Sequence, residues 1–508
     1  MYKQQPDFRN RYRITGTLVA KSPVHVGDGE RLRLSDRPAR FPPDYHDTDY
    51  SSFVSGANGA VLIPGSTLKG ILRAWLVRRG APQDLLESVF GTQDAGGKAE
   101  FHDAPLTGPA QGSNDYRWWD GNRGTCLAPG VSLDPRTGTA KDQLLYYTEF
   151  APEGSKFVVT VTAGNLIEDE RNLLLYAFEA GFRDKDDPPR VGAETADGWG
   201  VMEWLNAKCE VIQPGDVKGW LDVGAASSYQ SLFHEITAPV HALAAPALRP
   251  ALLLDVRLIF QGAVLVNDPS QFRKRNENTG DPGVGSATVR RRNGSYFLPG
   301  SSVRGALRSQ LRRIWQTLAH EKPGDLNSAK QVEAKRSQEQ TSLAALLRMM
   351  GAPGWKAPVT VPDFELQGTA RLHRQEFVAI DRFLGGAAEE KKFSAQGLYA
   401  PEFRATISID LDAWKAASVG GWAVLLLLFL LRDLQEGDIR FGFGSSKGYG
   451  VCAAQMEVKR RGDIPAEFGG NQLDDLVRGI LARSDEALRN ARLAEWEQDL
   501  VKLLETAA

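Results

Sequence analysis

Hydrophobic and polar positions alternate in two long stretches of the chain, one near its start and one near its middle. The first stretch covers residues 14–29 and the second covers residues 253–268; both are rich in β-branched residues and end in turn-forming residues. Each predicts a strand that leads into an irregular loop. Alternation returns over residues 156–162 and 403–411, which predicts two further strands.

Apolar residues recur at helical spacing after two Pro-Gly turns. Residues 61–73 read Val-Leu-Ile-Pro-Gly-Ser-Thr-Leu-Lys-Gly-Ile-Leu-Arg, and residues 296–308 read Tyr-Phe-Leu-Pro-Gly-Ser-Ser-Val-Arg-Gly-Ala-Leu-Arg. A Ser/Thr pair ahead of a periodic apolar run is a common helix start. The residues expected to face the core are Leu68, Ile71, Leu72 and Trp75 in the first segment and Leu307 and Leu311 in the second.

Two more pairs of segments match in the same order, so the chain repeats itself. Residues 133–146 resemble residues 380–393, and in both a Gly-bearing tip ahead of a strand predicts an extended hairpin. Residues 190–200, Arg-Val-Gly-Ala-Glu-Thr-Ala-Asp-Gly-Trp-Gly, align without a gap with residues 440–450, Arg-Phe-Gly-Phe-Gly-Ser-Ser-Lys-Gly-Tyr-Gly. Four ordered matches indicate an internal duplication.

A chain of 508 residues exceeds the size of one ordinary core, in agreement with two domains. We expect domains at residues 1–236 and 251–460, joined by the Ala/Pro-rich linker 237–250 and followed by a helical tail at 461–508. The order strand, loop, helix, hairpin, helix and Gly-rich loop predicts a ferredoxin-like α+β fold with hairpin insertions in each domain. The tail has an approximate apolar stripe that can pack on its own domain or on a neighbour: Leu488, Ala491, Trp496, Leu500 and Leu503.

Composition narrows the class of protein. With 42% hydrophobic and 24% charged residues the chain is globular rather than disordered, and its net charge of −2 means that any nucleic-acid site must come from local basic clusters. Cys126, Cys209 and Cys452 lie far apart, which argues against a zinc module or a disulfide scaffold. The polar N-terminus predicts no signal peptide, and the ten-residue apolar run 422–431 is too short to span a bilayer, so we expect a cytoplasmic protein without membrane contact.

The two periodic helices share a basic pattern, in which two cations one turn apart follow a helix start. These residues are Ser66, Lys69 and Arg73 in the first copy and Ser301, Arg304 and Arg308 in the second. A helix start offers free N–H groups and positive potential, so the pattern is suited to an RNA phosphate. A solvated helix face is the alternative interpretation, and the repetition of the register gives the two interpretations similar weight.

Other candidate contacts with RNA lie in loops. The Gly-rich segments 192–200 and 442–450 let a backbone approach a ligand closely, although such loops are more often turns. Trp199 and Tyr449 occupy equivalent positions, where each can stack on a base or pack in the core. Further basic candidates are Lys447 in the second Gly-rich loop and Arg290 and Arg291 in an earlier loop.

Taken together, these segments resemble the RAMP superfamily, whose members include backbone subunits of type III CRISPR effector complexes. The resemblance covers most of residues 12–455 and is carried by His25-Val-Gly27, the Ile-Pro-Gly-Ser motif at 63–70, Phe90-Gly91, the Ile-Asp-Arg-x-x-Gly motif at 380–385 and both Gly-rich loops. It implies two tandem domains similar to RNA-recognition motifs. It further implies that each helix and Gly-rich loop grips a CRISPR guide RNA, that His25 lies at the same RNA site, and that each hairpin kinks the duplex of guide and target RNA.

The resemblance also implies partners and an activity. The partners are guide RNA, complementary target RNA and other type III subunits, and the double-domain form looks most like the type III-D branch. Family members cut target RNA through an aspartate between the His-x-Gly and Pro-Gly motifs, by attack of a ribose 2′-OH on the adjacent phosphate with a divalent ion such as Mg²⁺. Asp36, in Asp-Arg-Pro, is the first candidate here and Asp49 the second, while the metal ligands stay unknown.

The second domain departs from this pattern, because Leu265 and Asn267 replace His25 and Gly27. Its nearby acid is Asp281, in Asp-Pro-Gly, so this domain either cuts through Asp281 or binds without cutting. Three alternatives to an RNA-cutting backbone subunit stay open: a purely structural subunit, a guide-processing endoribonuclease that uses His25 as a general acid or base, and a duplicated scaffold with no nucleic-acid role.

Overall fold

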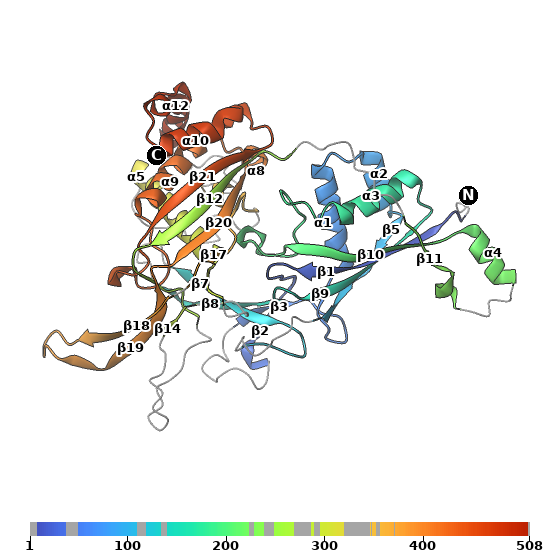
Figure 1. The fold of residues 1–508 in the computed structure, drawn as a ribbon, viewed down its shortest axis with the longest axis horizontal. Coiled ribbons are helices and arrows are strands. Elements are labelled where there is room, and N and C mark those ends of the chain that lie inside the picture. The colour runs from blue at the N-terminus through green and yellow to red at the C-terminus, as the bar shows by residue number, and fades with distance from the viewer. Residues whose placement is uncertain are drawn as a thin grey trace.

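The structure is a computed structural model of the whole chain. It describes residues 8–36, 49–108, 118–133, 140–222, 228–237, 248–268, 286–288, 295–319, 346, 348–351, 356–369 and 371–505. Figure 1 shows two sheets with helices packed on them and a long hairpin that projects from the second domain.

The first domain has a central antiparallel sheet with its first strand in the middle. Its elements are β1 (Arg11–Ala20), α1 (Gly65–Arg78), β5 (Ala99–Phe101), β6 (Ala104–Gly108), β9 (Lys156–Gly164), α3 (Glu168–Glu179) and β10 (Met202–Ile212). Strand β1 pairs with β10 on one side and β9 on the other, and β5 and β6 pair with β9. This spatial order of fourth, first, third and second strand is that of a ferredoxin-like fold.

The second domain repeats this arrangement. Its elements are β12 (Ala251–Phe260), α5 (Gly300–Leu318), β16 (Val359–Thr360), β17 (Phe364–Gln367), β20 (Glu402–Asp410), α9 (Trp422–Glu436) and β21 (Cys452–Arg461). Strand β12 lies between β20 and β21, and β16 and β17 pair with β20. The predicted fold of two tandem ferredoxin-like domains is therefore confirmed.

Sequence patterning explains how these elements bury one face. Buried and half-buried residues alternate along β1, as the period of two in a strand requires. On α1, Leu68, Leu72 and Trp75 are buried as predicted, and Ile71 packs against the same core from its edge. The equivalent face of α5 buries Leu307 and Leu311, with Val303 and Trp315.

Each domain also carries an accessory sheet that contains its hairpin. In the first domain the sheet comprises β2 (Gly27–Arg33), β3 (Asp49–Phe53), β7 (Cys126–Leu133) and β8 (Ala140–Phe150); in the second it comprises β13 (Ala263–Val264), β14 (Ser286–Ala287), β18 (Arg371–Ile380) and β19 (Ala387–Tyr399). The turn between β18 and β19 is held by Asp381, whose side chain accepts the N–H groups of Phe383 (2.8 Å) and Leu384 (2.9 Å). Phe383 and Leu384 are 99% and 85% exposed, so the hairpin presents an apolar tip to solvent.

The long apolar run and the tail together complete the second domain. The run lies in α9, which is buried over most of its length, and no helix among the described residues is long and apolar enough to cross a membrane. Helix α12 (Ala491–Glu505) packs on α9 through Trp496 and Leu500. Leu488 precedes α12 and is exposed, so the expected stripe holds only for its later members.

Shorter elements connect these parts. They are η1 (Leu34–Asp36), β4 (Leu62–Ile63), α2 (Gln83–Phe90), η4 (Thr195–Asp197), α4 (Pro214–Asp222), η5 (Tyr229–Leu232), β11 (His234–Glu235), β15 (Phe297–Leu298), α8 (Leu411–Ala416), η7 (Ser445–Lys447), η8 (Ala466–Phe468), η9 (Gly470–Gln472), α10 (Leu473–Leu481) and α11 (Asp485–Leu488). The short helices η4 and η7 lie in the two Gly-rich loops.

We expect Trp496→Ala to destabilise the second domain. The indole lies against Gly421, where an added Cβ would come within 2.2 Å of the ring, and its Nε1 donates a hydrogen bond to the carbonyl oxygen of Glu467 (3.1 Å). Removal of a buried tryptophan costs roughly 3–5 kcal/mol. Hydrogen exchange of α9, measured by mass spectrometry, should speed up accordingly. Val501→Ala on the exposed side of α12 is the control, and an equal effect of both variants would contradict the packing of the tail.

Candidate nucleic-acid interface

The start of each basic helix is fixed by a close backbone contact. A Cβ on Gly65 would lie 2.0 Å from the carbonyl oxygen of Phe101, and one on Gly300 would lie 2.1 Å from that of Val361. Only glycine fits at these positions, which explains the repeated Pro-Gly-Ser motif. The Ser66 and Ser301 side chains that follow are exposed.

An acidic residue occupies part of each helix start. The N–H of Gly65 donates to Asp103 (2.9 Å), and the N–H of Gly300 donates to Asp363 (2.9 Å). The prediction that these ends offer free N–H groups is therefore wrong for the first residue of each helix. A phosphate at these helices depends mainly on the cationic side chains that follow.

The cations of α5 form a row along one face. Arg304, Arg308 and Arg312 are spaced four residues apart, and Arg308 is exposed. Crowding by protein atoms and the positive charges of Arg304 and Arg312 lower the pKa of the Arg308 guanidinium. An approaching phosphate would relieve this repulsion. The equivalent residues of α1, Lys69 and Arg73, are half-buried, and Nε of Arg73 has no hydrogen-bond partner among the described residues.

Arg304 is already paired, with an acid from the other domain. Its Nε and Nη2 donate to the two carboxylate oxygens of Asp197 in η4, at 2.6 Å and 3.2 Å. Asp197 is 5% exposed and thus nearly sealed from water, whereas Arg304 is half-buried. Alongside it, the N–H of Val361 donates to the carbonyl oxygen of Ala196 (2.8 Å). The Gly-rich loop of the first domain thus docks on the start of α5, and Arg308, one turn further, is the exposed cation of the predicted pair.

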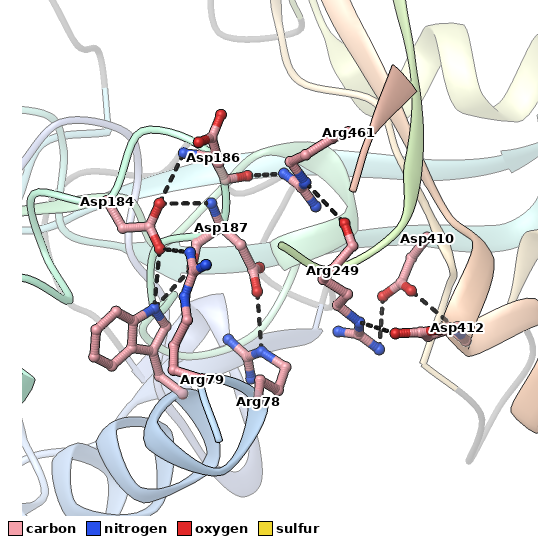
Figure 2. A network of polar contacts seen from close by, with 11 residues as sticks. Arg78, Arg79, Asp184, Asp186, Asp187, Arg249, Asp410, Asp412 and Arg461 are labelled. Carbon is pink, nitrogen blue, oxygen red and sulfur yellow. Dashed lines mark hydrogen bonds and ion pairs between the residues drawn. The ribbon is translucent and has the colours of Figure 1, made fainter. Parts of the chain in front are cut away.

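Figure 2 shows a second polar contact between the domains. Arg461, at the end of β21, donates to the backbone oxygen of Asp186 in the first domain and, through Nε, to the carbonyl oxygen of Arg249 (3.1 Å). The neighbouring Asp187 accepts a hydrogen bond from Nε of Arg78 on α1 (3.0 Å). Within the part of the chain that the structure describes, polar contacts therefore join the two domains at two separate places.

The glycines of the Gly-rich loops serve the protein's own packing. A Cβ on Gly192 would lie 2.0 Å from the carbonyl oxygen of His25, and one on Gly442 would lie 2.3 Å from that of Leu265. The next residue of each loop donates its N–H to the same oxygen, at 2.8 Å and 2.6 Å. In each domain the backbone of the Gly-rich loop thus approaches a residue that follows the first strand, whereas the sequence predicted a close approach to a ligand. Because the same contact occurs in both domains, His25 and Leu265 occupy equivalent positions.

The aromatic residues of these loops differ in exposure. Tyr449 is 3% exposed and its hydroxyl donates to Gln375 (2.8 Å), so it packs in the core and offers no face to a base. Trp199 is half-buried against Phe150, with ring centroids 5.3 Å apart. Of the two, only Trp199 keeps a partly accessible surface.

Lys447 combines charge with an aromatic surface. Its side chain is exposed, and its ammonium lies 4.8–5.3 Å from the ring centroids of Phe377, Phe393 and Phe443. Phe377 and Phe393 belong to β18 and β19, so this cation–π cluster sits on the hairpin. Cations beside exposed rings are typical of surfaces that bind single-stranded nucleic acid.

His25 lies inside the accessory sheet of the first domain. It is 6% exposed, and its Nδ1 donates to the carbonyl oxygen of Glu149 (2.6 Å). Burial lowers the pKa of the imidazole, because water no longer stabilises the charged form. The Glu149 carboxylate is buried too and accepts hydrogen bonds from Nε of Arg123 (2.9 Å), Oγ1 of Thr125 (2.5 Å) and the N–H of Phe53 (2.8 Å). His25 is therefore a structural residue rather than a contact for RNA.

The candidate acids lie around one end of the β2–β3 pair. Asp49 is exposed and opens β3 opposite Arg33, the last residue of β2, while Asp36 ends η1 three residues after Arg33. Both residues therefore lie near the same end of the β2–β3 pair. For Asp36 the structure describes the backbone alone. Asp281, Arg290 and Arg291 also lie outside them. No three His, Cys, Asp or Glu side chains among the described residues form a group that could hold a metal ion.

The burial of His25 generates a pH prediction. Its folded-state pKa is depressed, so its contribution to stability is complete above the unfolded pKa of about 6.5 and is lost as the pH falls below it. His25→Leu, which copies Leu265, should cost roughly 1–3 kcal/mol at pH 7.5 because the buried oxygen of Glu149 loses its donor. That cost should shrink towards pH 5.5.

Urea unfolding at pH 7.5, 6.5 and 5.5 measures this trend. His102→Leu, at an exposed site, controls for the loss of one imidazole. A His25→Leu cost that stays constant or grows towards pH 5.5 would contradict a buried, neutral His25.

Comparison with known families agrees with the duplication. The model of the RAMP superfamily matches the chain twice, over residues 17–203 and 266–453, so that one match lies in each of the two ferredoxin-like domains. No curated protein sequence matches the chain at a significant level. RAMP proteins are generally CRISPR-associated and RNA-binding, and they form multi-subunit complexes. Because the two matches cover well over half of the sequence, the chain belongs to the RAMP superfamily, as a tandem of two of its domains.

Proposed function

We propose that this chain is a guide-RNA-binding backbone subunit of a type III CRISPR effector complex, of the double-domain form seen in the type III-D branch. It fills two adjacent backbone positions, holds the duplex of guide and target RNA, and cuts the target. Its partners are guide RNA, target RNA and other subunits of the complex. The observation that carries this proposal is the exposed Arg308 of α5, with further positive charge on either side of it, together with Lys447 of η7, which lies against aromatic rings of the hairpin.

The geometry favours contact with RNA through α5 and the hairpin. Arg308 is exposed and flanked by positive charge, and Lys447 sits on three aromatic rings, so the second domain offers both an electrostatic and a stacking surface. The apolar tip at Phe383 and Leu384 lies at the end of the hairpin, where it can meet bases.

For cleavage we propose Asp36 as the catalytic carboxylate, with Asp49 as the second candidate. The ribose 2′-OH attacks the adjacent phosphate, the bond from phosphorus to the 5′-oxygen breaks, and the products carry a 2′,3′-cyclic phosphate and a 5′-hydroxyl. The carboxylate orients the 2′-OH or accepts its proton. A divalent ion such as Mg²⁺ would supply charge stabilisation near Asp36 and Asp49. The alternative of a guide-processing nuclease that uses His25 loses support, because the imidazole is buried and bonded to Glu149.

Arg308→Glu should weaken RNA binding by the purified chain. The loss of one phosphate contact reduces the slope of log affinity against log salt by about one, independent of RNA sequence. Fluorescence anisotropy of labelled single-stranded RNA between 50 and 300 mM salt gives this slope. Arg313→Glu makes the same charge change on the opposite side of α5 and is the matched control. Equal loss in both variants would mean a general charge effect and no site at Arg308.

Asp36→Ala should abolish one cut in the target RNA while guide binding and all other cuts persist. The measurement is cleavage by the reconstituted complex, with every product end mapped. Asp49→Ala and Asp281→Ala are run in parallel, and EDTA should stop the wild-type cut if a divalent ion is required. An unchanged cut pattern in Asp36→Ala would move the activity to another acid. Unchanged patterns in all three variants would leave a subunit that only holds the RNA.

A further inference from the structure

Each of the two elements that form the contact between the domains has an equivalent in the other domain. The first domain supplies its Gly-rich loop, η4, and the second supplies the start of α5. The second domain has the equivalent loop, η7, and the first has the equivalent helix, α1. Such a head-to-tail contact can in principle repeat from one copy of the chain to the next, because the two contacting surfaces differ and do not close on themselves.

Among the described residues, the equivalent loop η7 is open at its glycine. A Cβ on Gly198, after η4, would lie 2.8 Å from Cα of Pro362 in the second domain, whereas a Cβ on Gly448, after η7, would meet nothing within 4 Å. Both glycines have nearly the same backbone conformation, with φ of 87° and 83°. The two loops are therefore alike in backbone conformation at this glycine, and among the described residues Gly448 has no neighbour that corresponds to Pro362.

The charges of the two loops are opposite. Aligning residues 190–200 with residues 440–450 places Lys447 at the position of Asp197 and Gly444 at the position of Glu194. The facing helices are both basic, since Lys69 of α1 occupies the place of Arg304 in α5. Within the chain the contact joins acid to base. The same contact between two copies would join Lys447 to Lys69.

The backbone conformation of Glu194 indicates that an acidic side chain is important at this contact. Glu194 has φ of 55°, a left-handed conformation that glycine adopts without strain, and Gly444 takes that conformation at the equivalent position with φ of 82°. Glu194 lies close enough to Arg304 and Asp197 to interact with both charges. The loop that contacts a basic helix thus has an acid in a strained conformation. The open loop has a glycine at the equivalent position.

We propose that η7 is a docking surface which rejects a second copy of this chain and accepts a domain of the same fold that carries an acidic residue at the position of Lys69. The shape of the loop gives general fit to a ferredoxin-like partner, and its charge selects among partners. Like charges across the contact act as the repulsive element that specificity requires. The tandem chain therefore ends after two domains instead of growing into a filament of copies.

Charge exchange in the full-length protein tests this directly. Lys69→Glu turns the chain into its own acidic partner, and Lys447→Asp restores at η7 the acid found in η4. Each single variant should self-associate at least about tenfold more tightly than wild type, as measured by sedimentation velocity on RNA-free protein at 50 mM salt. The double variant should return to the wild-type level, because both sides of the contact would then carry an acid and repel each other again. Association of the single variants should weaken at 300 mM salt.

Arg313→Glu makes the same change of charge as Lys69→Glu away from both surfaces, and it should sediment like wild type. Circular dichroism and thermal melting establish that each variant is folded. The proposal is overturned if wild type self-associates as tightly as Lys69→Glu, if neither single variant associates more tightly than wild type, or if the double variant associates as tightly as the single variants. The two single variants alter different domains, so a folding defect in one leaves the other informative.

Discussion

The structure depends on glycines that allow close contact between two backbone segments at two places in each domain. Gly65 and Gly300 seat the starts of α1 and α5 on the carbonyl oxygens of Phe101 and Val361, and Gly192 and Gly442 seat the two loops against the residues just beyond the first strands. Both contacts exclude any side chain, so the helix start and the loop hold fixed positions relative to the sheet. The domain junction is built from these two seated elements, one from each domain.

The ion pair of Asp197 and Arg304 requires the loop and the helix start to hold these fixed positions. A carboxylate with 5% of its surface exposed needs a partner within hydrogen-bond reach, and a displacement of either element would leave a buried charge unpaired. Such a pair adds little net stability, but breaking it is costly because an uncompensated buried charge is left behind. It also changes the surface offered to RNA, because Arg304 is neutralised and the free positive charge of α5 shifts one turn along the helix, to Arg308.

The duplication, both helices with their buried faces, the hairpins and the ferredoxin-like fold follow from patterns within short segments, and these could be predicted from the sequence. The junction could not, because residues 197 and 304 are paired only by the tertiary fold. The state of His25 likewise depends on Glu149, which lies 124 residues away and brings Arg123 and Thr125 with it. Tyr449 gave an ambiguous signal since its burial is decided by the accessory sheet that covers it. One clue was present in the sequence: Asp197 aligned with Lys447 is a reversal of charge within an otherwise similar loop.

A net charge of −2 is compatible with a basic binding surface because many of the acids are committed to contacts inside the protein. Asp103 and Asp363 bind the first N–H of a helix, Glu149 holds Arg123, and Asp197 holds Arg304. Acids used in this way do not face an approaching polyanion, whereas Arg308 and Lys447 are exposed. The sign of the total charge therefore says little about the field at α5 and the hairpin, which is set by the cations that the fold exposes there.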